Sequence, residues 1–504
     1  MSSMPLKSQY SLLARILVYC YAINAFSYTG SDFDLWGHIK FGEDIWQAGA
    51  VPKTDPYNYV FPNHAWFNHE WLTEVLFYLL YKVFGSTGIL IFKLGLGLTI
   101  IHLLSQLYFE RSKNILVYCL FFILWTHVIA TGFASRPHLM TFLFLTVLLV
   151  ILYRYSEGKR RAVWWVSPLM VLWVNSHGGF VAGFGIFGMF VFVESITQIR
   201  ERGKPDPILF YSLGISFLAL LVNPYGYHLI TFLLETIPRE RQVEEWWPIP
   251  LWSIQFIHYK ILALLFLVSL FSPARKRPWE LAIIAFSVFY GFKHQRHSVL
   301  AVIVMVPMAA ACFAQLIESW TATHKNRSWP RWVHVGVLVS MGLFAGFQLS
   351  HNFLKWQRHG FQIHVDPAIN PVYAVRFLKE NEINGNIMTP SDWGEYVIWK
   401  LPESRVSVDG RYWTVYPPDF IIQNLVFHKG WEGWQYYLDL YNHEIILTAL
   451  ENQAIESHEE WVKIYQDSIS RIFVRRTDPP NLVHQKFIDR TLAYNSILPS
   501  PAFP

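Results

Sequence analysis

Acidic and imidazole side chains stand close together in the segment that follows the first apolar stretch of the chain. Asp32 and Asp34 are separated by one residue, and His38 follows within the same short run. Carboxylates at this spacing can act as a general base or bind a divalent cation, and an imidazole can assist in either role. A structural explanation exists as well, because aspartate often caps a helix and Asp34 precedes an amphipathic pattern over 35–48. The sequence leaves both interpretations open.

A second group of the same kind, His69 and Glu70, comes just before a short apolar stretch over 71–84. A negative charge at the start of a helix stabilises the helix, so Glu70 has a structural explanation. The functional alternative is that His69 and Glu70 face the first group and join it in one site.

Short turns later in the chain carry cations and imidazoles. Taken singly, Arg and Lys near a helix end can extend toward the membrane surface, and paired glycines permit a tight reversal. Taken together, these residues suit an anionic lipid headgroup, because guanidinium and ammonium groups bind phosphate. We predict that these residues, with His38, His69 and Glu70 of the first loop, bind the substrate, and that the two arginines are the main phosphate ligands. The residues of the later turns are Arg136, His138, His177, Lys293, Arg296 and His297.

The elements that hold these groups are predicted to be membrane helices. The chain of 504 residues is 53% hydrophobic and only 15% charged, whereas soluble domains carry about 25% charged residues. A spanning helix needs about 20 mainly apolar residues. The stretch 71–84 contains Glu74 and Lys82, and we expect it to lie at the membrane interface. Eleven other stretches are candidate spans: 11–28, 88–109, 115–133, 139–153, 163–175, 179–197, 207–222, 257–273, 279–292, 298–317 and 332–350.

The charges of the loops predict the orientation in the membrane. Every second loop between the apolar stretches is basic, which puts those loops and the N-terminus on the cytoplasmic side. The loop 29–70 and the tail from 351 onward are then external. The net charge of +5 is modest and lies mostly in short loops, so it indicates topology and not a nucleic-acid partner.

The tail has the composition of a soluble domain. Strand-like runs at 386–389, 405–408, 444–448 and 470–475 alternate with helical patterns at 371–383, 417–427 and 431–440, which predicts a small α/β domain. The predicted fold class is therefore a polytopic α-helical membrane protein with about eleven transmembrane helices and a C-terminal external α/β domain. We expect a membrane domain over 1–350, which includes the loop 29–70, and a soluble domain over 351–504.

Several of these motifs resemble a large group of bacterial membrane proteins that are assigned to the GT-C glycosyltransferase superfamily. The resemblance is carried by residues 32–38, 49–56, 68–71, 175–179, 223–226 and 408–411. It is weaker to protein O-mannosyltransferases, aminoarabinose transferases and oligosaccharyltransferases. The mannosyltransferases have adjacent Asp and Glu where this chain has Asp32 and Asp34 around one residue, and many members of the group have Trp where this chain has Gly37.

The resemblance implies an enzyme of the bacterial inner membrane. Such an enzyme moves a sugar from a polyprenyl-phosphate donor to an acceptor on the external, periplasmic face, with inversion at the anomeric carbon. By position, Asp34 is the residue that acts as a base or orients the acceptor, and Asp32 comes second. A divalent metal, Mg²⁺ or Mn²⁺, held by Asp32 and Asp34 stays open, because relatives with and without metal exist. The sugar is not specified, and the acceptor is a glycan, a lipid or a protein.

The alternative is a polytopic membrane protein without catalytic activity, either a transporter or a scaffold that binds lipid-linked glycans. Transporters usually carry polar groups near the middle of the membrane, often with internal repeats. In this chain the polar groups gather at one face and no repeat is visible. The pattern therefore favours the enzyme over the transporter, while a scaffold has the same sequence features as an enzyme.

Overall fold

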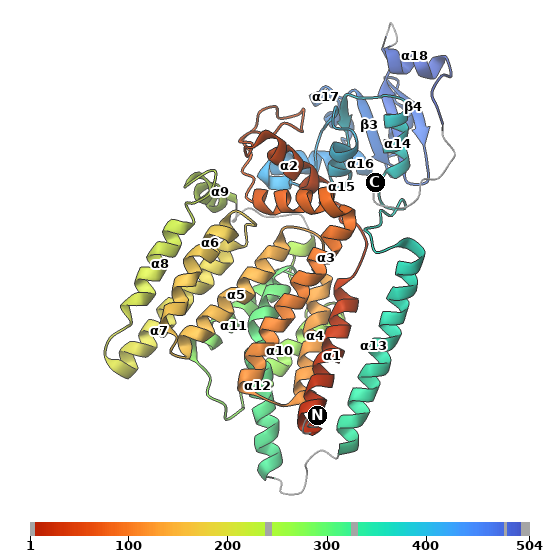
Figure 1. The fold of residues 1–504 in the computed structure, drawn as a ribbon. Helices are drawn as coiled ribbons and strands as arrows, with labels where there is room; N and C mark the ends of the chain where they lie inside the picture. Colours follow the sequence, from red (N-terminus) through yellow and green to blue (C-terminus); the bar gives the residue numbers. More distant parts are fainter. Residues whose placement is uncertain (1–5, 237–243, 324–330, 478–480, 495–504) are drawn as a thin grey trace. The chain divides into compact units, whose positions relative to one another are not determined.

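Each of the eleven apolar stretches contains a helix in the computed structural model, which describes residues 6–236, 244–323, 331–477 and 481–494 (Figure 1). The predicted positions of these helices are confirmed. They are α1 (Leu6–Phe26), α3 (Trp71–Arg111), α4 (Ile115–Thr131), α5 (His138–Ser156), α6 (Val166–Val174), α7 (Phe180–Arg202), α8 (Pro207–Ala219), α10 (Ile257–Ser269), α11 (Pro278–Lys293), α12 (His297–Thr323) and α13 (Arg331–His359).

Five of the described helices are long and apolar enough to cross a membrane, by length and composition: α3, α5, α7, residues His297–Ala322 of α12 and residues Val335–Leu354 of α13. Helix α6 has nine residues, and at about 1.5 Å per residue it is too short to span a bilayer. The number of eleven spans therefore stays a prediction.

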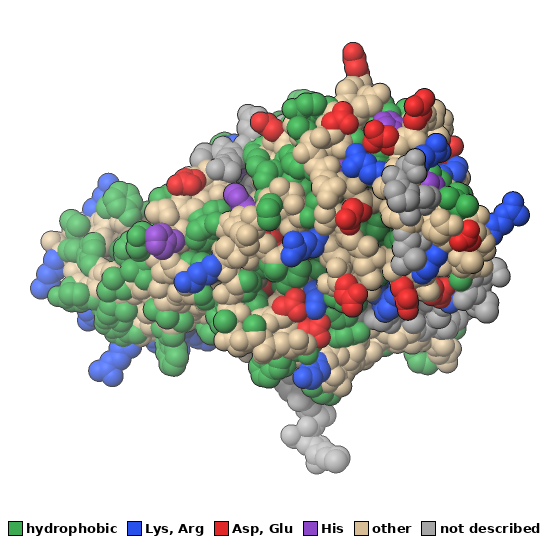
Figure 2. All heavy atoms as spheres, turned by 90° about the horizontal axis from the view of Figure 1, so that it is seen from above, with side chains coloured by type: hydrophobic (Ala, Val, Ile, Leu, Met, Phe, Trp, Pro, Cys, Tyr) green, Lys and Arg blue, Asp and Glu red, His purple; other side chains and the backbone are tan. Residues whose placement is uncertain are grey.

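Large apolar side chains are exposed on several of these helices. Examples from α7 and α8 are Phe192, Phe210, Tyr211 and Leu218. Hydrophobic side chains also cover much of the left part of the surface in Figure 2. Exposed apolar surface of this extent suits contact with lipid. Together with the five apolar helices, it marks the chain as an integral membrane protein.

The chain divides into two units. The helical unit comprises Met1–Tyr28, Leu90–Tyr227 and Arg239–Phe361, and the α/β unit comprises Thr29–Ile89, His228–Pro238 and Gln362–Pro504. The first loop and the start of α3 thus pack with the C-terminal part of the chain. The acidic residues of the first loop and those of the tail therefore belong to one unit.

Gly85 interrupts α3. Its φ of 62° and ψ of −158° are not helical, and glycine adopts this region without the strain that a side chain would add. The sequence predicts two helices here, over 71–84 and 88–109, and the interruption confirms that division. The residues before Gly85 belong to the α/β unit, and those from Leu90 onward belong to the helical unit.

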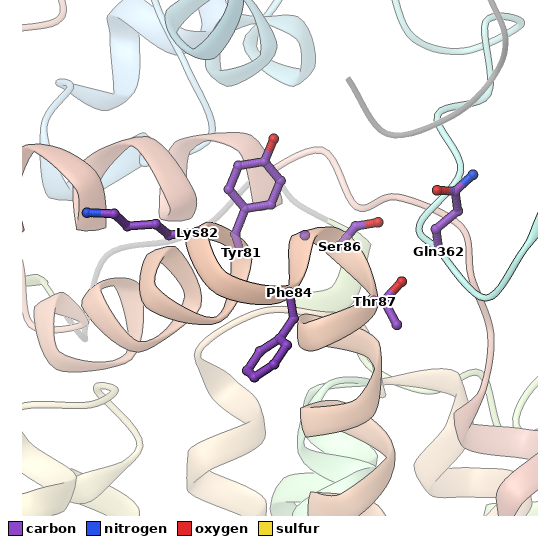
Figure 3. A pocket seen from close by; sticks show the side chains of 7 residues that line it. Tyr81, Lys82, Phe84, Ser86, Thr87 and Gln362 are labelled. Atoms are coloured by element: carbon purple, nitrogen blue, oxygen red, sulfur yellow. The ribbon is translucent and has the colours of Figure 1, made fainter.

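An open pocket of about 500 Å³ lies at this interruption, within the α/β unit (Figure 3). The Ile363 backbone N–H donates a hydrogen bond to the Ser86 hydroxyl at 3.1 Å. In Figure 3, Tyr81 and Phe84 point to opposite sides of the helix. The residues that line the pocket include no acidic or imidazole side chain. They are Tyr81, Lys82, Phe84, Gly85, Ser86, Thr87 and Gln362.

Five strands form the sheet of the α/β unit, in the order β2-β1-β3-β5-β4. Strand β1 pairs in parallel with β2 and β3, and β5 pairs antiparallel with β3 and β4. The four predicted strands are confirmed as β1 (Asn386–Met388), β2 (Arg405–Val406), β3 (Ile445–Ala449) and β5 (Ser470–Arg475). Strand β4 (Trp461–Gln466) was missed, and its pairing with β5 is irregular between Lys463 and Tyr465.

Helices flank this sheet. They are α14 (Val372–Glu380), α15 (Ser391–Lys400), α16 (Pro418–Lys429), α17 (Gln435–Leu440) and α18 (Leu482–Ile488), and the first loop adds α2 (Leu35–Ala48). Helix α9 (His228–Thr236) belongs to the same unit. The predicted helical patterns at 371–383, 417–427 and 431–440 correspond to α14, α16 and α17.

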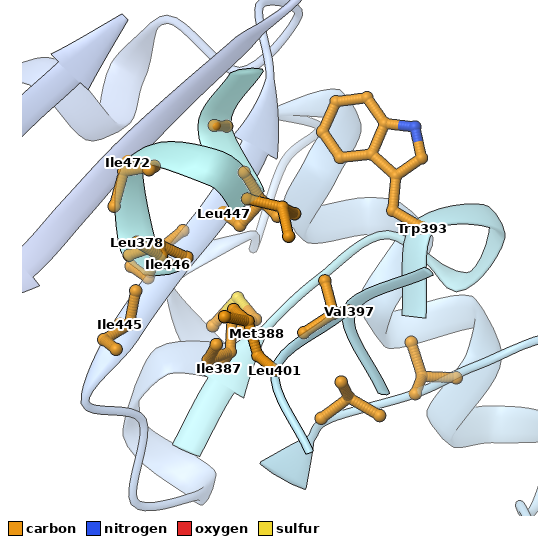
Figure 4. Packing of buried hydrophobic residues seen from close by; sticks show 14 of the residues in the cluster. Leu378, Ile387, Met388, Trp393, Val397, Leu401, Ile445, Ile446, Leu447 and Ile472 are labelled. Atoms are coloured by element: carbon orange, nitrogen blue, oxygen red, sulfur yellow. The ribbon is translucent and has the colours of Figure 1, made fainter. Parts of the chain in front are cut away.

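The core of the α/β unit combines both parts of the chain. Ile387 of β1 and Ile446 of β3 are fully buried, and they pack with side chains of α14 and α15 (Figure 4). Trp36, Phe41 and Trp66 of the first loop belong to the same hydrophobic cluster. Burying three large aromatic side chains gives several kcal/mol of hydrophobic stabilisation, by the usual value of about 2 kcal/mol or more for each. This burial holds the first loop to the tail.

Two buried histidines should make the α/β unit sensitive to acid. His443 donates to the Tyr437 carbonyl at 2.9 Å and accepts from the Tyr59 hydroxyl, which requires a neutral ring. Burial lowers the pKa of His443 to about 4 and the pKa of His428 to about 3. The unfolded rings have a pKa near 6.5, so the unfolded state binds more protons below that pH, and stability is lost as the pH falls from 6.5 toward 4.

When the pH falls from 7.5 to 5, each of these histidines should lower the free energy of unfolding by about 2 kcal/mol, because the ring is protonated in the unfolded state and neutral in the folded state. The denaturation midpoint of the full chain at the two pH values measures the change. The variant His443→Gln keeps a donor but cannot bind a proton, so it should be less stable at pH 7.5 and lose less on acidification. An equal loss in both proteins would contradict the assignment.

Candidate active site

Asp34 lies at the N-terminus of α2 but does not cap the helix. Its backbone is helical, with φ −86° and ψ −9°, and its side chain accepts no capping hydrogen bond. The Asp34 backbone N–H instead donates to Asp32 Oδ1 at 3.1 Å. Both aspartates are half-buried. The capping explanation for Asp34 is therefore wrong, and Asp32 holds the turn that presents Asp34.

The Asp34 carboxylate lies against Gly410, which follows strand β2 in the turn 409–411. A Cβ atom placed on Gly410 would stand 3.0 Å from Glu395 Oε1 and even closer to Asp34 Oδ1. Two carboxylates from distant parts of the sequence therefore approach the same point. Glycine is needed there because any side chain would occupy the space between them.

Glu395 is held in place by α2. It lies on α15, is 2% exposed, and its Oε2 accepts the Gly37 backbone N–H at 3.1 Å. A Cβ atom on Gly37 would overlap the Glu395 carboxylate. The ring of Trp36 meets the ring of Tyr396 edge to face at 5.1 Å. The glycine at position 37 thus makes room for a buried carboxylate.

Gly410→Ala should disturb both carboxylates while the sheet stays folded. The methyl group would fall on Asp34 Oδ1 and beside Glu395 Oε1, so at least one of them must move. If this pair is the reacting site, turnover should fall about tenfold or more, because displacements near 1 Å have large kinetic effects. The control is Gly214→Ala, an exposed glycine inside α8, where a Cβ atom would meet nothing within 4 Å. Unchanged turnover in Gly410→Ala would separate this pair from the reaction.

A second acidic group surrounds His38 of α2. His38 Nδ1 is 3.1 Å from Glu74 Oε1 and 4.0 Å from Glu70 Oε2. The Asn68 amide donates to Glu74 Oε2 at 2.5 Å. His69 Nε2 lies 3.8 Å from Glu70 Oε1. The predicted meeting of the two first-loop groups is therefore present in the structure, with Glu74 as an added member.

The charges around His38 set its protonation. Burial by itself lowers the pKa of His38, but the hydrogen bond to Glu74 and the negative charges of Glu70, Glu74 and Asp34 outweigh burial and raise the pKa above its ordinary value. His38 is 7% exposed and Glu74 is 2% exposed. The pair is therefore a buried charge-assisted contact, which fixes α2 against the start of α3.

Arg411 joins the first loop to the tail. Its guanidinium binds Asp55 at 2.9 Å and Asp409 at 2.6 Å, and all three side chains are buried. It also lies over the rings of Phe41 and Trp66, at 4.9 and 4.6 Å from the ring centres. Arg411 and Asp55 thus have a structural role, and they fix the turn that contains Gly410.

The predicted cation set lies in the helical unit. His138 and His177 have ring centres 6.3 Å apart, His138 Nε2 donates to the Gly132 carbonyl at 2.7 Å, and His177 Nδ1 lies 2.8 Å from the Thr141 hydroxyl. Arg136 lies two residues before His138, in the same turn. A Cβ atom on Gly132 would stand 3.1 Å from Val299, so this turn adjoins the start of α12.

Arg296, at that same end of α12, is engaged with a neighbouring segment. Its guanidinium pairs with Glu245 at 2.7 Å and lies 4.7 Å from the centre of the Trp246 ring. His297 packs edge to face on the same ring at 5.5 Å, and Lys293 is exposed. Of the two arginines that we predict as phosphate ligands, Arg296 is thus paired with a carboxylate in the structure.

The structure thus brings Asp32, Asp34, His38, His69 and Glu70 together in the α/β unit. Sequence reasoning gave no role in the site to Glu74 and Glu395. Glu74 had a signal, because it is a charge in an apolar stretch four residues after Glu70. Among the described residues, the cluster with metal-binding geometry is His38, Glu70 and Glu74, and the predicted pair Asp32 and Asp34 is not part of it.

Comparison with solved structures gives the identity of the fold. The oligosaccharyltransferase of Archaeoglobus fulgidus, tethered to an acceptor peptide, superposes with a TM-score of 0.55 at 10% identity, covering 95% of this chain and 75% of that one. The chain has the GT-C fold. The resemblance inferred from the first-loop motifs is confirmed at the level of the fold.

Two structures of ArnT from Cupriavidus metallidurans, also a GT-C glycosyltransferase, are similar as well. The apo structure has a TM-score of 0.50 at 12% identity, covering 92% of this chain and 96% of that one. The structure bound to undecaprenyl phosphate has a TM-score of 0.48 at 10% identity, covering 93% and 98%. No family model and no curated protein matches the sequence.

Proposed function

We propose that this GT-C protein is a glycosyltransferase that moves a sugar from a polyprenyl-phosphate donor to an acceptor, with inversion at the anomeric carbon. The observation that carries the proposal is the half-buried Asp34 carboxylate, which does not cap its helix and lies with Glu395 at Gly410, in a chain with this fold. A base must reach an acceptor from solvent or membrane, and Asp34 is accessible whereas Glu395 is buried.

In the proposed reaction, the acceptor hydroxyl oxygen bonds to the anomeric carbon as the bond from that carbon to the phosphate oxygen breaks. Asp34 accepts the hydroxyl proton, and polyprenyl phosphate leaves with the bonding electrons. Glu395, fixed by the Gly37 N–H, is a positioning residue that keeps Asp34 in its orientation. Asp32 supports the same turn through the Asp34 N–H.

The remaining predicted residues are assigned to binding. Arg136, Lys293 and Arg296 of the helical unit bind the donor phosphate, because guanidinium and ammonium groups pair with phosphate. His138, His177 and His297 orient the phosphate or sugar, and His69 and Glu70 contact the acceptor side. His38 is too buried to contact a sugar or an acceptor, so in this reaction its role is to fix α2. These assignments rest on residue type and on the neighbours described above.

The proposal also covers the membrane, the orientation of the chain in it and the binding partners. The protein would lie in a bacterial inner membrane, with the N-terminus in the cytoplasm and the α/β unit on the periplasmic side, as the alternation of basic loops predicts. Its partners would be a polyprenyl-phosphate sugar and an acceptor that is a glycan, a lipid or a protein.

Turnover in nanodiscs tests the proposal. The purified full chain is offered a panel of radiolabelled polyprenyl-phosphate sugars with membrane extract as acceptor, and release of polyprenyl phosphate is followed. We expect one donor to be consumed, with an inverted linkage in the product. Binding of a donor without turnover under all acceptor conditions would favour the scaffold instead, and transport of a bound donor without bond cleavage would favour the transporter.

A further inference from the structure

We propose that His38, Glu70 and Glu74 bind a divalent transition-metal ion between α2 and the first turn of α3. The three side chains each offer one ligand atom, and these atoms lie within 4.8 Å of one another. Two ligands on one ion at about 2.1 Å stand up to about 4.2 Å apart, so small rotations of the carboxylates suffice to close the site. The inference does not depend on the proposed function, because it concerns binding alone.

The helices are built to bring these ligands together. Glu70 precedes α3, and the Glu74 N–H donates to the Glu70 carbonyl at 3.1 Å, so the two carboxylates stand one turn apart on the same face. A Cβ atom on Gly42 would overlap the Glu74 backbone carbonyl. Since Gly42 lies one turn after His38 on α2, it permits the close approach of the helices through which His38 reaches Glu74.

A supporting shell surrounds the ligands. The Asn68 side chain donates to Glu74 Oε2, and its carbonyl oxygen accepts the Glu70 backbone N–H at 3.1 Å, so one amide orients the Glu74 carboxylate and fixes the Glu70 backbone. Oriented second-shell groups of this kind are usual at metal sites and tune their affinity. His38 and Glu74 are buried, and Glu70 is half-buried, which leaves an entry path from the Glu70 side.

The ligand set selects the class of ion. One imidazole nitrogen and two carboxylate oxygens suit Zn²⁺ or Mn²⁺, whereas Mg²⁺ prefers oxygen ligands only and keeps several waters. The two carboxylates carry two negative charges. A proton on His38 balances one of them, whereas a divalent cation balances both, and buried charges need such compensation. The site differs from the Asp32 and Asp34 pair that the sequence indicates for Mg²⁺ or Mn²⁺.

Metal content of the full chain tests the proposal. The protein is purified in detergent, stripped with EDTA, dialysed against micromolar Zn²⁺ or Mn²⁺ with millimolar Mg²⁺ present, and assayed by mass spectrometry of the elements. We expect about one equivalent of Zn²⁺ or Mn²⁺ and a higher melting temperature than the stripped protein. Less than a tenth of an equivalent, or displacement by Mg²⁺, would overturn the proposal.

Variants assign the ion to this site. His38→Ala and Glu70→Gln should each weaken metal binding at least about tenfold. Loss of a second-shell group alone usually lowers metal affinity about 10–100-fold, and these two residues are direct ligands. Glu70→Gln is the safer variant, because Glu70 is half-buried and lies outside the helix. The matched controls are His64→Ala and Glu43→Gln, which change the same residue types in the same segment. Equal metal content in Glu70→Gln, His38→Ala and the controls would show that the ion binds elsewhere.

Discussion

Asp34→Asn should lower the rate of sugar transfer by about 10³-fold while the protein folds and inserts normally. A positioned general base contributes about 10²–10⁴-fold, and asparagine cannot accept the acceptor proton. The fold should tolerate the change, because the Asp34 side chain makes no capping hydrogen bond to α2. Single-turnover release of polyprenyl phosphate from the donor identified in the nanodisc assay measures the loss.

Two further variants serve as controls for Asp34→Asn. Asp32→Asn removes a carboxylate that accepts the Asp34 N–H, so it should lower the rate much less. Asp392→Asn changes an exposed carboxylate in the first turn of α15 and should leave the rate unchanged. Donor binding should persist in Asp34→Asn, since the phosphate ligands that we propose lie in other turns. Full activity in Asp34→Asn would remove this residue from the mechanism, and an equal loss in Asp32→Asn would shift the role of base to the pair.

Arg411→Ala should destabilise the α/β unit by about 3–5 kcal/mol, because it leaves the buried carboxylates of Asp55 and Asp409 without their cation. The guanidinium also fills the space between the rings of Phe41, Tyr57 and Trp66. Its loss should release the first loop from the tail. We expect a lower melting temperature and faster chymotrypsin cleavage within residues 51–66 of the full chain.

The control for this change is Arg405→Ala, which removes the same charge from an exposed position on β2. Arg411→Lys should rescue little, because an ammonium group cannot bridge two carboxylates and stack on aromatic rings as the planar guanidinium does. If Arg411→Ala melted within a degree of the parent and resisted chymotrypsin equally, the ion cluster would not be what holds the loop.

The sequence by itself determined where the helices and most strands lie. Apolar stretches of fixed length and alternating strand-like runs are local patterns, and each can be recognised without its neighbours. The same holds for the first-loop residues Asp34, His38 and Glu70, whose types and close spacing marked them as chemically capable. Strand β4 was not predicted because its pairing with β5 is irregular, and the irregularity weakens the alternation of apolar and polar residues by which a strand is recognised.

Only the tertiary structure decided which of these residues meet. Glu395 joins the site through the N–H of Gly37, a residue 358 positions away, and no local pattern records that contact. Glu74 is explained as a partner of His38 only when α2 and α3 approach at Gly42. Such contacts depend on close backbone approach and on burial, which are properties of the packed chain. The sequence therefore determined the chemical groups, and packing of the first loop with the tail determined which carboxylate lies beside which.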